Sequence, residues 1–179
     1  ASVIAAYFKK AKPRSKILII DGNPDVTSKG PLFKKAWKEL YGDMVEYRPE
    51  HKVAGVDART NTVRFDVQDD VKADVLNVLP VMRAGALAVQ TGLANANGRW
   101  CHVNFLNFES TAAMDIHVIG DAIQIAQGMP KSGHMANSHA KVCAAAIVAE
   151  LQGMEINPHP MLTNVCMSYV DDTHVIHVA

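Results

Sequence analysis

Apolar residues follow two patterns in the first part of this chain. Val3, Ile4, Tyr7 and Phe8 recur at helical spacing up to Pro13, which predicts a helix over residues 1–10. An unbroken run over residues 17–20 then has the length and β-branching of a strand buried on both faces of a parallel sheet.

Asp21 stands directly after that predicted strand. A helix, a buried strand and a terminal acid, in this order, are the second and third pieces of a dinucleotide-binding βαβ unit, in which Asp21 would face an adenosine ribose. Alternatively, Asp21 only opens the turn Asp21-Gly22-Asn23-Pro24, whose residues all favour turns. The sequence favours the turn over the ribose contact.

The next segments alternate between helix and strand patterns. Ser28 can cap a helix over residues 31–41, and residues 44–67 predict three short strands with a hairpin turn at residues 59–61, a β-meander. Residues 73–79 resemble a second buried strand. Pro80 breaks it, and this break is the best domain boundary in the sequence.

The part of the chain after Pro80 centres on residues 115–141. A helix over residues 84–91 closes at Gly92, and an apolar strand over residues 116–119 is expected to run into Gly120-Asp121-Ala122. The Ala-rich segment 138–151 predicts a helix that must be enclosed by other structure, and residues 161–179 predict one or two strands. The order of these elements predicts an α/β fold with parallel sheets.

The amino-acid composition argues against several classes of function. The 179 residues carry 18 basic and 18 acidic side chains, so nucleic acid and anionic membranes are unlikely main partners, and no apolar run reaches the length of a spanning helix. Three cysteines without a CxxC exclude a disulfide-rich scaffold and offer no zinc spacing. The eight histidines are not spaced for a metal either: His134 and His139 lie off a common helical face. We therefore expect no metal site.

Gly120-Asp121 is a candidate cofactor contact. A carboxylate after a buried strand can accept hydrogen bonds from cofactor hydroxyls, and glycine lets the backbone approach closely. A bare pair of this kind more often just ends a strand. Here, residues 129–133 can open a helix whose free N–H groups and dipole would face an electron-rich group such as a reduced isoalloxazine.

Cysteines are the other candidates. Cys101, beside Trp100, could be a redox thiol if its thiolate is stabilised and a second sulfur lies in reach, or simply a small buried hydrophobe. Cys143 and Cys166 are interpreted as buried hydrophobes.

Several strings now become recognisable. SKILIIDGNPDVTSKGPLFKKAWKELYGDMVEY, KADVLNVLPVMRAG, GRWCHVN, NFES, IHVIGDA and MPKSGHMANSHAKV closely resemble the flavoprotein subunit of flavocytochrome c sulfide dehydrogenase, a family related to sulfide:quinone oxidoreductases and, more distantly, to glutathione-reductase-like enzymes. The resemblance implies FAD, two Rossmann-like domains and a C-terminal interface domain. It also implies that sulfide attacks a redox disulfide, that electrons pass through the flavin to a separate cytochrome c subunit, and that the protein is periplasmic.

The resemblance assigns roles residue by residue. Cys101 matches the second cysteine of the redox disulfide, Gly120, Asp121 and Ala122 match the flavin-contacting GDA, and Pro130, Lys131, Ser132 and Gly133 match the PKSG beside the isoalloxazine. Two residues depart from the family: His102 stands in place of a proline and His134 in place of the usual tyrosine. The implied domains are a partial second Rossmann domain over 1–79, part of the FAD-binding domain over 80–157, and the start of the interface domain over 158–179.

The expected whole is an incomplete two-Rossmann-domain flavoprotein with a β-meander insertion. The glycine-rich FAD fingerprint and the first disulfide cysteine would lie upstream of Ala1, so we expect this chain to hold about half a flavin site, to bind FAD weakly or not at all, to be inactive alone and to self-associate. Two alternatives stay open: an NAD(P)H-dependent flavin or disulfide reductase that uses Asp21, and a non-catalytic self-associating fragment.

Overall fold

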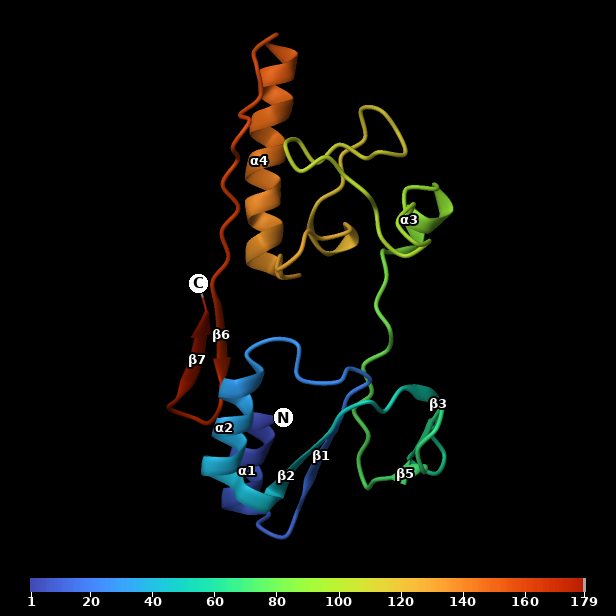
Figure 1. The fold of residues 1–179 in the computed structure, drawn as a ribbon, viewed down its shortest axis with the longest axis vertical. Helices are drawn as coiled ribbons and strands as arrows, with labels where there is room; N and C mark the ends of the chain where they lie inside the picture. The colour runs from blue at the N-terminus through green and yellow to red at the C-terminus, as the bar shows by residue number, and fades with distance from the viewer. Residues whose placement is uncertain (179) are drawn as a thin grey trace. The chain divides into compact units, whose positions relative to one another are not determined.

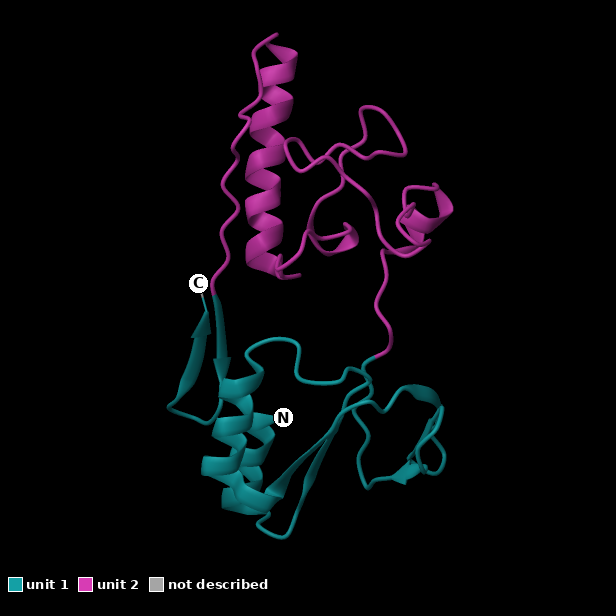
Figure 2. Cartoon of the chain, in the orientation of Figure 1, with its two compact units in different colours: residues 1–79, 166–178 teal, residues 80–165, 179 magenta. Residues whose placement is uncertain are grey.

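The computed structural model describes residues 1–178, which form two compact units (Figure 2). Unit 1 comprises residues 1–79 and 166–178, and unit 2 comprises residues 80–165. The chain leaves unit 1 between Leu79 and Pro80 and returns to it at Cys166. The described part of the expected interface domain, residues 158–178, is therefore divided between the two units.

Unit 1 is built on two helices and a parallel strand pair (Figure 1). Helix α1 spans Ser2–Ala11 and α2 spans Gly30–Tyr41, followed by the 3-10 turn η1, Gly42–Met44. Strand β1, Ile17–Ile20, pairs in parallel with β2, Val45–Arg48, with Ile17 opposite Val45. Ala5, Trp37 and Tyr41 form the buried core between the helices and these strands.

Three predictions for unit 1 need correction. Residues 45–48 were expected to open the meander, but they pair in parallel with β1. Residues 17–20 are half-buried rather than buried on both faces, and among the described strands β1 pairs only with β2. Helix α2 begins after Lys29, whose backbone is left-handed with φ of 56°, and not through a Ser28 cap.

The meander itself is present, one segment later than expected. Strands β3, Val53–Asp57, β4, Thr62–Phe65, and β5, Val71–Lys72, pair antiparallel in that order. The predicted strand at 73–79 does not form, and Val75 and Leu79 are 84% and 87% exposed. A continuous apolar run needs cover on both faces to become a buried strand, and no described strand pairs with this one.

The last strands of unit 1 form a hairpin. β6, Cys166–Tyr169, pairs antiparallel with β7, Val175–Val178, as one of the two arrangements expected for residues 161–179. The Tyr41 hydroxyl, from α2, donates to the backbone carbonyl of Val170 just after β6. This bond ties the hairpin to α2.

Unit 2 consists largely of irregular chain packed on one long helix. Its elements are α3, Ala86–Gln90, the 3-10 turn η2, Gly120–Ala122, and α4, Gly133–Leu151. Isolated bridges join Cys101 to Ile123, Val103 to Ser110 and Glu109 to His117. The core cluster contains Val103, Phe108, Ile123 and Cys143.

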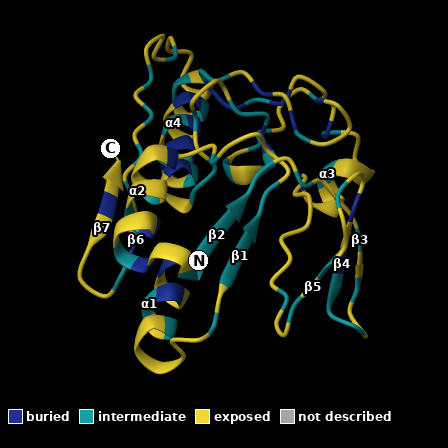
Figure 3. Cartoon of the chain, turned by 60° about the horizontal axis from the view of Figure 1, so that its bottom comes forward, coloured by how far each residue is buried: buried dark blue, intermediate teal, exposed yellow. Residues whose placement is uncertain are grey.

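Two expectations for unit 2 are wrong. Residues 116–119 are not a buried strand: only His117 forms a bridge, and Ile116 and Ile119 are 45% and 40% exposed. Left-handed residues flank this segment, Asp115 at φ of 60° and Gly120 at 70°. Helix α4 is buried on one side only (Figure 3), and Leu151 near its end is 82% exposed.

The mixture of helices with parallel and antiparallel strands confirms the α/β class predicted from the sequence. Across residues 1–178, no helix combines the length and apolarity needed to cross a membrane. In the same range, no three His, Cys, Asp or Glu side chains gather as they would around a metal ion.

Candidate functional site

The Gly120–Ala122 turn is locked against α4. A Cβ atom on Gly120 would lie 3.3 Å from the Cβ of Ala136, and Gly120 has φ of 70°, a conformation that glycine adopts without strain. The Gly120 N–H donates to Nδ1 of His139 at 3.1 Å. The turn and the helix are therefore held together by a close backbone approach and by one hydrogen bond, and Figure 1 shows the turn beside the start of α4.

His139 belongs to this site, although no role for it there was predicted from the sequence. Its side chain is 1% exposed, and its ring lies 4.6 Å from the ring of Phe108, centroid to centroid. Because Nδ1 accepts from Gly120, the neutral ring carries its proton on Nε2, and Nε2 has no partner among the described residues. Burial lowers the pKa of His139, and the Asp121 carboxylate opposes that shift only in part.

A signal for His139 was present in the sequence. It lies four residues from both Met135 and Cys143, so it shares their helical face, and both of those side chains are buried. A lone polar residue on an apolar face needs an internal partner, and this one finds it in the Gly120 amide.

Ser132 caps α4, within the segment 129–133 that was expected to open a helix. Its hydroxyl accepts from the Met135 N–H at 3.0 Å and donates to Oδ1 of Asn164 at 2.6 Å. The helix begins at Gly133 rather than at residue 138. Gly133 and Asp121 are both exposed, so the positive end of the α4 dipole and the Asp121 carboxylate are open to solvent.

Lys131 connects the remaining predicted site residues. Its ammonium donates to the backbone carbonyls of Asp121 and Ile123 at 2.6 and 2.7 Å, and it lies 3.7 Å from the centroid of the Trp100 ring. Burial lowers the pKa of Lys131, with the Asp121 carboxylate acting in the opposite direction. Its donors are directed at the protein itself, so Lys131 fixes the course of residues 121–123.

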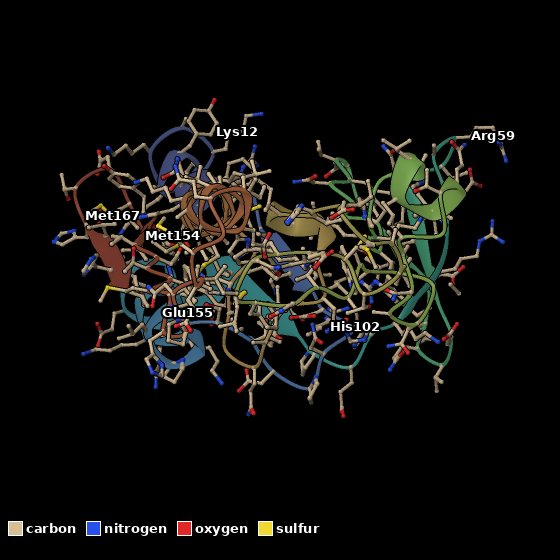
Figure 4. All side chains as sticks on the ribbon, turned by 90° about the horizontal axis from the view of Figure 1, so that it is seen from above. Lys12, Arg59, His102, Met154, Glu155 and Met167 are labelled. Carbon is tan, nitrogen blue, oxygen red and sulfur yellow. The ribbon has the colours of Figure 1, made fainter. Side chains whose placement is uncertain are left out.

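Cys101 lies on the other side of the same segment. Its N–H donates to the Ala122 carbonyl at 3.0 Å, and its carbonyl accepts from the Gln124 N–H at 2.8 Å. The side chain is fully buried, and burial raises the pKa of the Cys101 thiol while the charge of Lys131 opposes the rise. The structure thus places Cys101 beside the Asp121 turn as a packed, neutral thiol, next to the exposed His102 (Figure 4).

Asp21, in unit 1, is held in its own turn. Its Oδ1 accepts from the Asn23 N–H at 2.9 Å and from Nδ2 of Asn23 at 2.7 Å, and its Oδ2 accepts from the Tyr47 hydroxyl at 3.0 Å. Burial alone would raise the pKa of Asp21, but these hydrogen bonds outweigh it, and the pKa lies below its ordinary value. This geometry agrees with the turn interpretation of Asp21.

Comparison with solved structures finds the same fold in larger proteins. The chain is similar to sulfide:quinone oxidoreductase from the hyperthermophilic bacterium Aquifex aeolicus, with a TM-score of 0.76 and 16% identity, over 99% of this chain and 49% of that one. It is also similar to reduced CoADR-RHD from Bacillus anthracis, with a TM-score of 0.58 and 19% identity, over 87% of this chain and 28% of that one. These identities establish a shared fold.

A third similar structure comes from a different assembly. A chain in the cryo-EM structure of the Tetrahymena thermophila mitochondrial ATP synthase matches with a TM-score of 0.72 and 19% identity, over 98% of this chain and 44% of that one. The present chain therefore spans less than half the length of each of these three structures.

A family model supports the resemblance found in the sequence. Residues 1–80 match the central part of the flavoprotein chain of sulfide dehydrogenase (flavocytochrome c). Residues 1–80 thus match the family that the sequence resembles, and nearly the whole chain shares the fold of the sulfide:quinone oxidoreductase structure.

Proposed function

We propose that this chain forms one wall of an FAD site in a sulfide dehydrogenase-like flavoprotein oxidoreductase. The observation that carries the proposal is the Gly120–Ala122 turn, fixed on the first half of α4 with the Asp121 carboxylate exposed. It lies in a chain whose residues 1–80 match the flavoprotein family.

The residues fit a flavin. The missing side chain of Gly120 lets the turn approach Ala136 of α4 closely, and the exposed Asp121 carboxylate can accept hydrogen bonds from hydroxyl groups. Gly133 opens α4, whose positive end favours a negatively charged group. When bound, FAD would supply the two-electron acceptor of the reaction. Pro130 and Ser132 would line the space next to the first turn of α4, and the small side chain of Ala122 would leave room for the flavin.

Lys131 acts as a positioning residue in this proposal. Because its ammonium binds the carbonyls of Asp121 and Ile123, it orients the backbone that carries the acid. The positive charge of Lys131 also lowers the pKa of the Cys101 thiol, whereas burial raises it. Lys131 would therefore stabilise the Cys101 thiolate that is released when a disulfide at this position is reduced.

Cys101 is proposed as one sulfur of the redox disulfide. Burial keeps solvent and solutes away from the Cys101 sulfur, so the attack by sulfide would fall on the partner sulfur of the disulfide, and Cys101 would leave as the thiolate beside Lys131. The resemblance further suggests a cytochrome c subunit as electron acceptor and a periplasmic location, and both belong to this proposal. Self-association of the isolated chain and its weak binding of FAD belong to it as well.

Flavin binding tests the proposal. A protein containing this chain, and the chain itself, should be reconstituted with FAD and titrated by visible absorption and flavin fluorescence. Asp121→Asn should weaken FAD binding by about tenfold, because the flavin hydroxyls would donate to a neutral amide oxygen in place of a carboxylate. Asp115→Asn is the matched control, since Asp115 is an exposed acid in left-handed backbone that asparagine tolerates. A longer protein without a flavin band, or with unchanged affinity in Asp121→Asn, contradicts the proposal.

Sulfide-driven reduction tests the role of Cys101. Rapid mixing of the flavin-loaded protein with sulfide and, separately, with NADH distinguishes a sulfide dehydrogenase from an NAD(P)H-dependent reductase. Cys101→Ser should abolish reduction by sulfide, and Cys143→Ser, another buried cysteine, should not. Both carboxylate oxygens of Asp21 accept hydrogen bonds within unit 1, so the NADH alternative is decided by the rate of reduction with NADH.

A further inference from the structure

A lysine and a cysteine that are far apart in sequence meet in unit 1. Nζ of Lys29, at the start of α2, lies 3.0 Å from Sγ of Cys166 and 2.8 Å from Oγ of Ser168. Cys166 and Ser168 are two residues apart on β6, so their side chains share one face of the strand. The left-handed backbone of Lys29 turns the chain into α2 at this point. The ammonium is therefore held between a thiol and a hydroxyl.

The ammonium of Lys29 has no carboxylate partner among the described residues. The side chain is half-buried, and none of the ion pairs found within residues 1–178 involves it. Of the two acceptors of this ammonium, only the thiol can ionise near neutral pH. The hydrogen bond from Lys29 is accordingly the largest influence on Cys166 and lowers the pKa of its thiol, against the opposing effect of burial.

Cys166 differs from the other two cysteines in the pKa of its thiol and in its exposure to solvent. Cys101 and Cys143 are buried, and burial raises the pKa of each thiol. Cys166 is partly exposed, so its interpretation as a buried hydrophobe is wrong. Its neighbour Met167, labelled in Figure 4, is 64% exposed and lies on the opposite face of β6. A low-pKa thiol that solvent can reach is the kind that reacts with oxidants.

We propose that the Lys29–Cys166 pair is a peroxide-reactive thiol site, separate from the flavin site of unit 2. The Cys166 thiolate attacks one oxygen of hydrogen peroxide, an S–O bond forms, and the O–O bond breaks. Sulfur loses two electrons and becomes a sulfenic acid, while the departing hydroxide takes a proton from solvent and becomes water. Lys29 stabilises the attacking thiolate, and the proposal does not depend on FAD.

Alkylation rates test the thiolate. The folded chain is treated with iodoacetamide over a range of pH, and modification of each cysteine is followed by peptide mass spectrometry. At neutral pH, Lys29→Met should slow the modification of Cys166 roughly tenfold, the effect of about one pKa unit. Lys38→Met, on the exposed side of α2, should leave the rate unchanged, and Lys29→Arg should retain most of it.

The wild-type protein supplies a test that needs no folded variant. Its rate of Cys166 modification should reach half of its maximum below the ordinary thiol pKa of about 8.5. Hydrogen peroxide followed by dimedone should then label Cys166 and not Cys101 or Cys143, and Cys166→Ser should remove the label. A midpoint at or above the ordinary value, equal rates in the wild type and Lys29→Met, or labelling of Cys101 before Cys166 would overturn the proposal.

Discussion

The backbone N–H of Gly120 donates to Nδ1 of His139 across 3.1 Å, and this bond joins the candidate cofactor turn to α4. Replacing His139 by Leu would leave the Gly120 N–H in a half-buried site without its acceptor. The expected cost is about 1–3 kcal/mol in the free energy of unfolding. Urea denaturation followed by circular dichroism measures it.

Two variants make this prediction specific. His139→Asn keeps a side-chain acceptor at the same position and should recover part of the loss. His102→Ala changes an exposed histidine elsewhere in unit 2 and should leave the stability within about 0.5 kcal/mol of the wild type. A His139→Leu variant as stable as His102→Ala would show that the hydrogen bond contributes nothing measurable.

The same histidine makes the stability of unit 2 depend on pH. The pKa of His139 is lowered in the folded state, so below the ordinary value of 6.5 the unfolded chain takes up a proton that the folded chain resists. The contribution of His139 is therefore fully present above about pH 6.5 and is lost as the pH falls below it. Unfolding midpoints at about pH 7.5 and about pH 5 should differ more in the wild type than in His139→Asn. An equal pH dependence in the two proteins would contradict the assignment.

Gly120 can be compared with a second glycine of similar backbone conformation. Gly120→Ala introduces both a strained φ and a Cβ atom 3.3 Å from Ala136, whereas Gly128→Ala, at φ of 81°, meets no atom within 4 Å. Each variant should lose about 1–2 kcal/mol through backbone strain, and Gly120→Ala should lose more through crowding. Thermal unfolding of both variants measures the difference. Only Gly120→Ala should also weaken FAD binding by the proposed holoprotein.

Lys131 should be structurally important although it is a lysine near the surface. Lys131→Met removes two hydrogen bonds to carbonyls and the contact with the Trp100 ring, each bond to a charged group being worth about 1.5–3 kcal/mol at most. The variant should be destabilised and its tryptophan emission should change, because Trp100 loses its cation. Lys141→Met, on the exposed side of α4, is the control. Unchanged emission in Lys131→Met would argue against the cation–π contact.

Local signals in the sequence were sufficient for several elements. Helix α2 follows from its apolar face and from Pro31 in the first turn, and residues 129–133 were expected to open a helix, as they do at the start of α4. Both signals lie within a few residues of the element they define. The predicted strands at 73–79 and 116–119 failed because an apolar run reports a tendency to be buried, and only a neighbouring chain makes it a strand.

The contacts of the candidate site could not be predicted in the same way. The sequence suggested Asp121 and residues 130–133, but the bond from Gly120 to His139 joins residues 19 apart, and Lys29 meets Cys166 across 137 residues. Neither pair has a spacing rule, because each depends on how two segments pack. Asp21 shows the opposite case: its turn chemistry is local, and the sequence favoured the turn correctly.

Asp21 also makes a prediction for unit 1. Its carboxylate holds the turn after β1 through Asn23 and reaches β2 through the Tyr47 hydroxyl, whose pKa is raised to about 12, chiefly by burial and then by the bond to Asp21. Asp21→Ala should therefore cost about 1–3 kcal/mol, whereas Tyr47→Phe, which removes one of the bonds, should cost less. Because the pKa of Asp21 is lowered on folding, its contribution is present above the ordinary value of 3.8 and is lost as the pH falls below it. Acid titrations of the wild type and Asp21→Ala should converge at low pH, and a constant difference between them would show that the carboxylate charge is not the stabilising feature.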